Sequence, residues 1–253
     1  PERFFMEGVS EQAILGMSAG LALEGYLPFV NTIATFLTRR SFEQIAIDLC
    51  HHDLPVKLIG NGGGLVYAPL GPTHQAIEDI SILRTLPNMT ILAPCDANEM
   101  KSLILATLKW PHPVYIRLSR GDEQLLTKTS QKFVIGKSVI LKKPTEFLFI
   151  TTGIASRIAF NASSKLEKEF NIKAGVIHFP TIKPLDSKSL IKSIKKAKKI
   201  ITVEENVLAG GFGSSILEFC SDNLKEHLYK ISRVGLKDAF VDDYGDQSAL
   251  LTK

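Results

Sequence analysis

Two short stretches of the sequence carry side chains suited to acid–base chemistry. In the first, a Gly71-Pro72 turn delivers Thr73 and His74 to the entrance of a segment with apolar periodicity. An imidazole exchanges protons near neutral pH, so His74 is a candidate acid–base group. In the second, Glu11 stands in the first turn of a small, apolar segment. A carboxylate there either benefits from the helix dipole or, when buried, needs a partner for its charge.

The elements that must position these residues alternate between apolar strands and helices, which is typical of a parallel α/β sheet. After His74, isoleucine or leucine recurs every third residue from 77 to 83, as on one helical face, and Pro87 stops the helix. We expect strands over residues 27–31, 55–59, 89–93, 114–118, 147–151, 174–178 and 199–204, and further helices over 13–23, 41–50, 97–108, 156–170 and 187–196.

The helix expected at 13–23 is small and apolar almost all round, with Gly16, Ala19 and Gly20 among its residues. A helix that is apolar on every side is buried, and small side chains allow another backbone to approach closely. The sequence therefore predicts that the chain forms a homodimer through the helix 10–24.

Length and composition narrow the class of protein. A chain of 253 residues with 45% apolar residues is long enough for one large or two medium globular domains. The net charge of +4 is mild and its basic residues are spread out, so no nucleic-acid partner is expected. Cys50, Cys95 and Cys220 are too few and too far apart for a disulfide framework or a zinc site, which indicates a reducing compartment such as the cytoplasm. No apolar run has the length of a membrane span.

The stretch from Gly71 to Gln75 continues into Pro87-Asn88-Met89 and the turn Ala93-Pro94-Cys95-Asp96. This ordered series resembles the transketolase family of thiamine-diphosphate enzymes, which includes deoxyxylulose-phosphate synthase. Members hold a diphosphate-binding domain, a pyrimidine-binding domain and a C-terminal domain. The resemblance covers nearly the whole chain but only the last two of these domains.

The resemblance and the α/β pattern together imply two domains, each a mostly parallel sheet flanked by helices. We expect a pyrimidine-binding domain over residues 1–121 and a transketolase C-terminal domain over 146–253. The polar, lysine-containing stretch 122–145 would link them, with room for one β-hairpin.

The resemblance also implies roles for particular residues. Glu11, in the segment Gly8-Val9-Ser10-Glu11, would hydrogen-bond the aminopyrimidine of thiamine diphosphate, and Phe36 would pack against it. His74 would relay protons or bind substrate oxygens. Arg39 and Arg120 would bind substrate, for which a guanidinium fork suits a phosphate or carboxylate. The alternatives are a core position for Phe36 and ordinary ion pairs or solvation for the two arginines.

Two positions depart from the family pattern. Transketolases place a histidine where Gly62 stands and an aspartate where Leu70 stands, and both side chains help to hold the phosphorylated sugar. Their replacement puts the usual sugar-phosphate substrate in doubt.

No Gly-Asp-Gly motif, which anchors Mg²⁺ and the diphosphate in thiamine-diphosphate enzymes, occurs in the sequence. We therefore expect no metal site in this chain. We expect an N-terminal diphosphate-binding subunit to hold Mg²⁺ and complete a heterotetramer; the alternative is that these residues are a fragment of a longer chain that carries the diphosphate-binding domain itself. The expected activity is transfer of a two-carbon ketol or related acyl unit from a ketose or 2-oxo acid to an aldehyde. Two alternatives stay open: the β subunit of a 2-oxo acid dehydrogenase E1 component, and a non-catalytic scaffold.

Overall fold

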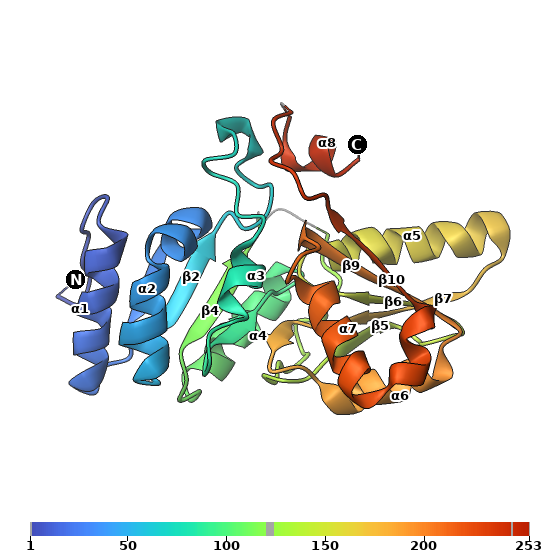
Figure 1. The fold of residues 1–253 in the computed structure, drawn as a ribbon, viewed down its shortest axis with the longest axis horizontal. Helices are drawn as coiled ribbons and strands as arrows, with labels where there is room; N and C mark the ends of the chain where they lie inside the picture. The colour runs from blue at the N-terminus through green and yellow to red at the C-terminus, as the bar shows by residue number, and fades with distance from the viewer. Residues whose placement is uncertain (1, 120–123, 244, 253) are drawn as a thin grey trace.

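The computed structural model describes residues 2–119, 124–243 and 245–252. They form two α/β domains that lie side by side, each built on a five-stranded, mostly parallel sheet (Figure 1). The two-domain α/β fold predicted from the sequence is confirmed. None of the described helices is long and apolar enough to cross a membrane.

The N-terminal sheet has four parallel strands and one antiparallel edge strand. In spatial order they are β1 (Phe29–Ile33), β2 (Lys57–Asn61), β4 (Val114–Leu118), β3 (Thr90–Leu92) and β8 (Thr181–Lys183). Because β1 and β2 are parallel, with Ile33 opposite Asn61, their carboxyl ends meet at one edge of the sheet. The segments that follow them, 34–40 and 62–78, are thereby brought together, and these segments hold most of the predicted site residues.

Helix α1 (Glu11–Leu23) lies at the outer end of this sheet (Figure 1). Leu15 and Ala19 are buried against the domain, whereas the face with Gly16 and Gly20 is exposed. A Cβ at either glycine would meet no described atom within 4 Å. Burial on every side is therefore wrong for the single chain, and α1 presents one smooth face outward.

The segment after β1 is not the ordinary α-helix predicted for 41–50. It consists of π-type turns at Phe36–Arg40 and Ile45–His51 around a short α2 (Phe42–Gln44). The Thr38 hydroxyl donates to the Ala34 carbonyl (2.8 Å), which fastens the entry of the first turn. Widened turns of this kind are found at functional sites, and periodicity alone does not distinguish them from α-helix.

The helix expected after His74 is shorter than predicted. Gly64 and Ala76 exchange two backbone hydrogen bonds (2.8 and 3.0 Å), so Ala76 is held in an isolated β-bridge and cannot yet be helical. Only then does α3 (Asp79–Leu83) begin. His74 consequently lies on a loop, after a 3₁₀ turn at Ala68–Leu70.

Aspartate N-caps start three of the described helices, and two of these starts, at residues 97 and 187, were predicted. The Asp96 side chain accepts from Glu99 N (2.9 Å) at α4 (Ala97–Thr107). Asp186 accepts from Ser189 N (3.2 Å) at the start of α6. Such a cap typically contributes about 1 kcal/mol. The third is Asp246, at the start of α8.

The C-terminal sheet has the order β10-β9-β6-β7-β5. Its strands are β10 (Ile231–Leu236), β9 (Lys199–Val207), β6 (Phe147–Thr151), β7 (Ala174–His178) and β5 (Val139–Lys142). The helices around it are α5 (Ala155–Phe170), α6 (Ser187–Lys196), α7 (Phe212–Asn223), the 3₁₀ turn Lys225–Lys230 and α8 (Gln247–Leu251).

Two edge strands pair with partners that the sequence did not indicate. β5 lies inside the stretch expected as a linker, where it pairs antiparallel with β7 instead of forming a hairpin. β8 leaves the C-terminal part of the chain and pairs antiparallel with β3, with Leu92 opposite Thr181. The domain limits at 121 and 146 remain predictions.

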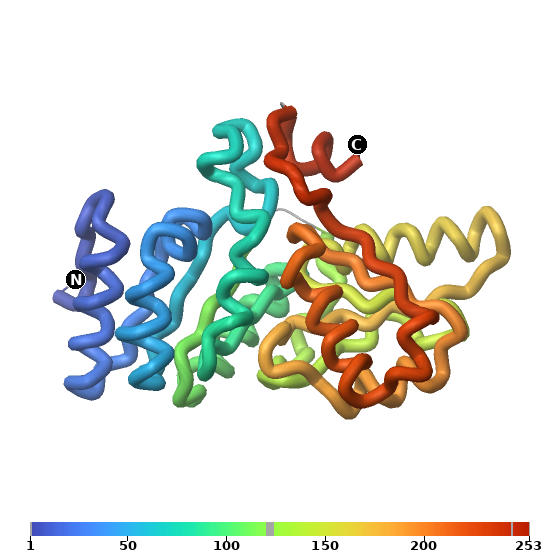
Figure 2. Tube along the Cα trace, viewed as in Figure 1, coloured from blue at the N-terminus to red at the C-terminus, as the bar shows by residue number. Residues whose placement is uncertain are grey.

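The last residues of the chain return to the loop 62–78, as the tube in Figure 2 shows. Leu250 packs with Leu65 and Ile77 in a small apolar cluster. Gln75 Nε2 also donates to the Val241 carbonyl (3.1 Å). The C-terminal domain therefore supports the loop that carries His74.

Candidate active site

Glu11 begins α1 and is 5% exposed. Its Oε2 accepts a hydrogen bond from Arg40 Nη1 at 2.8 Å, and this ion pair compensates the buried carboxylate. Arg40 itself is half-exposed, and its backbone carbonyl accepts from Gln12 Nε2 (3.0 Å). The partner that the sequence demanded for a buried Glu11 is thus supplied within the chain.

Phe36 contacts both the Arg40 guanidinium and the His74 imidazole. The guanidinium carbon of Arg40 is 4.7 Å from the centre of the Phe36 ring, which is a cation–π distance. The His74 ring meets Phe36 edge-on, with 5.1 Å between ring centres. His74 Nδ1 is in turn 2.9 Å from the Thr73 hydroxyl. Glu11, Arg40, Phe36 and His74 therefore form one continuous group.

Arg39 fastens the loop on which His74 lies. It forms an ion pair with Glu78, and its Nη2 donates both to Glu78 Oε2 (2.8 Å) and to the Gln75 carbonyl (2.9 Å). The hydrogen bond that Arg39 donates to Glu78 raises the pKa of Arg39. Of the two alternatives for this residue, the structure shows the ion-paired state, and substrate binding by Arg39 stays a prediction.

A hollow of about 350 Å³ opens beside Phe36, lined by Thr35, Phe36, Arg39, Arg40 and Thr73. Thr35 is buried, and among the described residues its hydroxyl has no hydrogen-bond partner. An unpaired buried hydroxyl is costly unless a ligand or water satisfies it. The hollow has an aromatic wall from Phe36, and the Glu11 carboxylate is paired with Arg40, one of its lining residues. An aromatic wall with a carboxylate behind it fits a flat, nitrogen-rich ring such as an aminopyrimidine.

Four of the predicted site residues, namely Glu11, Phe36, Arg39 and His74, lie around this hollow or against its lining. Arg120 lies outside the residues that the structure describes. Arg40 was missed by sequence reasoning, although its position four residues after Phe36 was a signal that both side chains share one face of a helical turn.

Tyr67 lies against Gly62, the position where the family resemblance implies a histidine. Gly62 has a φ of +72°, and a Cβ added there would collide with the ring of Tyr67. The Tyr67 ring therefore occupies the space into which a side chain at 62 would project. Leu70, in place of the family aspartate, is 57% exposed.

A buried polar network behind the loop was also missed. Arg117 Nε donates to Asp79 Oδ2 (3.0 Å), and Arg117 Nη2 donates to the Glu205 carbonyl (2.8 Å). The Tyr115 hydroxyl donates to the same Asp79 oxygen (2.6 Å), and burial together with the Asp79 charge raises the pKa of Tyr115. Glu205 Oε1 accepts from Gln247 Nε2 (2.6 Å). This network joins the two domains and fixes α3, with Asp79, behind the loop.

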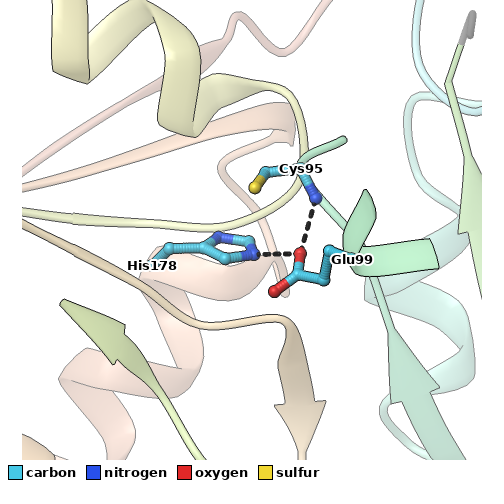
Figure 3. A group of neighbouring side chains, drawn as sticks. All are labelled: Cys95, Glu99 and His178. Atoms are coloured by element: carbon cyan, nitrogen blue, oxygen red, sulfur yellow. Dashed lines mark hydrogen bonds and ion pairs between the residues drawn. The ribbon is translucent and has the colours of Figure 1, made fainter. Parts of the chain in front are cut away.

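Cys95, Glu99 and His178 meet at a second buried junction between the domains (Figure 3). His178 Nε2 is 2.8 Å from Glu99 Oε2, and His178 Nδ1 is 2.7 Å from the Ser156 hydroxyl. An imidazole nitrogen and a carboxylate oxygen bound to one tetrahedral zinc ion would lie about 3.3 Å apart. Burial, together with the Glu99 charge, raises the pKa of the Cys95 thiol and disfavours its thiolate. The group is therefore a hydrogen-bonded tie between domains.

The sequence and fold of the chain match known proteins. Residues 1–124 match the model of the transketolase pyrimidine-binding domain, and residues 136–252 match that of the transketolase C-terminal domain. The chain belongs to the transketolase family and corresponds to its C-terminal portion.

Three relatives illustrate the range of the family. One subunit of an apulose-4-phosphate transketolase, from Phocaeicola vulgatus, is 37% identical over 88% of this chain and 72% of its own. The 1-deoxy-D-xylulose-5-phosphate synthase of Syntrophus aciditrophicus is 38% identical over 96% of this chain, which spans only 37% of that enzyme. A solved split-gene transketolase, described as an inactive beta4 tetramer, superposes with a TM-score of 0.85 and 34% identity over 94% of this chain and 76% of its own.

Proposed function

We propose that this chain is the C-terminal subunit of a thiamine-diphosphate-dependent, transketolase-like transferase. The enzyme moves a two-carbon ketol or related acyl unit from a ketose or 2-oxo acid donor to an aldehyde acceptor. The observation that carries the proposal is the continuous group of Glu11, Arg40, Phe36 and His74 beside the hollow that Phe36 and Arg40 line.

Each side chain has a task that its position supports. Glu11 binds a pyrimidine ring nitrogen and holds the proton there, and Phe36 offers its ring as a stacking surface. His74, on a loop held by Arg39, exchanges protons with substrate oxygens. Bound thiamine diphosphate supplies the carbanion chemistry that breaks and forms the carbon–carbon bond.

Mg²⁺ and the diphosphate are held by an N-terminal diphosphate-binding subunit or domain, because the Gly-Asp-Gly motif that would hold them does not occur among these 253 residues. The names of the relatives support such a division, since one is a single subunit of a transketolase and another is a split-gene transketolase. We further propose that two copies of this chain associate through the exposed face of α1. Phe4, Met6 and Val9, which precede α1, are more than 60% exposed and extend the apolar surface of this face.

The substrate differs from that of ordinary transketolases. Tyr67 fills the space over Gly62, and Leu70 replaces a carboxylate, so a sugar phosphate would find neither the family imidazole nor the family carboxylate there. Arg120, one residue past Ser119, remains our candidate for an anionic group of the substrate.

The test compares two variants in the enzyme reconstituted with its diphosphate-binding subunit. Glu11→Ala should abolish thiamine-diphosphate-dependent turnover while circular dichroism shows an unchanged fold. Glu43→Ala, which removes an exposed carboxylate from α2, is the matched control and should keep full activity. Near-normal turnover by Glu11→Ala would refute the role of Glu11. A wild-type complex that binds no thiamine diphosphate would instead favour the non-catalytic scaffold.

A further inference from the structure

Arg40 touches the two groups that a pyrimidine ring needs. Its Nη1 donates a hydrogen bond to Oε2 of Glu11 (2.8 Å), and its guanidinium lies over the Phe36 ring, 4.7 Å from the ring centre. In the function proposed above, the same carboxylate meets a ring nitrogen and the same aromatic ring is the stacking surface. A planar guanidinium and an aminopyrimidine compete for such places because both are flat and both offer N–H donors.

The backbone around Arg40 allows its side chain to move without unfolding the turn. The Arg40 carbonyl accepts from Gln12 Nε2 at 3.0 Å, so the main chain is fastened independently of the guanidinium. The side chain is 44% exposed and therefore has an open path to water. Arg39, by contrast, is held by Glu78 and by the Gln75 carbonyl and cannot leave without releasing the loop.

We infer that Arg40 is a positioning residue that fills the pyrimidine site of the free subunit and must swing out when thiamine diphosphate binds. The inference rests on the proposed function. It adds a residue that keeps a buried carboxylate paired until the cofactor replaces its partner. The guanidinium thus protects the site while the subunit is alone and lowers the apparent affinity for the cofactor.

The size of this competition follows from the two contacts. A half-exposed ion pair and an exposed cation–π contact each contribute only a modest free energy. Removing both should therefore tighten the binding of thiamine diphosphate by roughly 3- to 30-fold. The effect concerns the affinity for the cofactor, which is measured without substrate.

The test measures dissociation constants by titration calorimetry, with thiamine diphosphate and Mg²⁺ added to the reconstituted complex in the absence of substrate. Arg40→Gln and Arg40→Met remove the charge, and both should bind the cofactor more tightly than the wild type. Arg40→Lys keeps a charge near Glu11 but lacks the planar group over Phe36, so its affinity should lie between. Lys101→Gln removes one exposed charge from α4 as the matched control and should bind like the wild type.

Unchanged or weaker binding in both Arg40→Gln and Arg40→Met, with circular dichroism showing folded subunits, would overturn the inference and leave the proposed function intact. A wild-type complex that binds no thiamine diphosphate would overturn both. If Arg40 had only a structural role, its replacement would lower the unfolding midpoint without increasing the affinity for the cofactor. This outcome separates a structural role from competition.

Discussion

Replacing Arg117 by methionine should destabilise the chain severely, because it leaves two buried carboxylates without their cation. Asp79 has a fully buried side chain and Glu205 one that is 2% exposed. Arg117 Nε is 3.0 Å from Asp79, whereas its Nη1 is 3.9 Å from Glu205, so Asp79 loses the closer partner. Breaking a buried pair from one side costs about 3–5 kcal/mol.

The assay is urea unfolding followed by the fluorescence of Trp110, the single tryptophan, and by circular dichroism. The matched control is Lys198→Met, which breaks the exposed pair with Glu146 (2.8 Å) and should cost less than about 1 kcal/mol. Adding Asp79→Asn to Arg117→Met should restore part of the loss, since one uncompensated charge is removed. A loss for Arg117→Met no greater than that of the control would refute the account of this network.

Three further predictions concern the stability and specificity of the chain. Burial lowers the pKa of Lys57 from 10.5 to about 8, so between these values only the unfolded chain keeps the proton. Stability should therefore rise with pH across this window by at most about 3 kcal/mol relative to Lys57→Met. Urea unfolding at a series of pH values that gives both proteins the same dependence of stability on pH would contradict this. Gly62→Ala should lower the free energy of unfolding by about 1–2 kcal/mol through its left-handed backbone alone, and by more because the new Cβ collides with Tyr67. Tyr67→Ala should relieve the collision, so the double variant should lose less than the sum of the two single losses; additive losses would count against the collision. Without the family imidazole and carboxylate, xylulose 5-phosphate with ribose 5-phosphate should be used at least about tenfold less efficiently than by ordinary transketolases, and coupled assays showing equal efficiency would end that proposal.

The central strands were predictable because burial on both faces makes them continuous apolar runs. The expected ranges 114–118, 147–151 and 174–178 agree with β4, β6 and β7 residue for residue. The helix at 187–196 also agrees, since Asp186 caps its start. These elements are determined by local patterns that one sequence displays.

Features that depend on distant partners were not predictable in the same way. The delayed start of α3 comes from the pairing of Ala76 with Gly64, and the placement of β8 comes from its pairing with β3. For the site, the identities of Glu11, Phe36 and His74 came from motifs. The Arg40–Glu11 pair depends on where α1 packs beside the first π-type turn, which no local pattern encodes.

The most direct test of the central claim asks where thiamine diphosphate binds. Titration calorimetry with thiamine diphosphate and Mg²⁺ should show weak binding or none on this chain alone, because the proposed pyrimidine site comes without the Gly-Asp-Gly diphosphate anchor. The same titration on a mixture with the diphosphate-binding subunit should show tight, magnesium-dependent binding that Glu11→Ala weakens. Tight, magnesium-dependent binding by the isolated chain would contradict a site shared between two subunits.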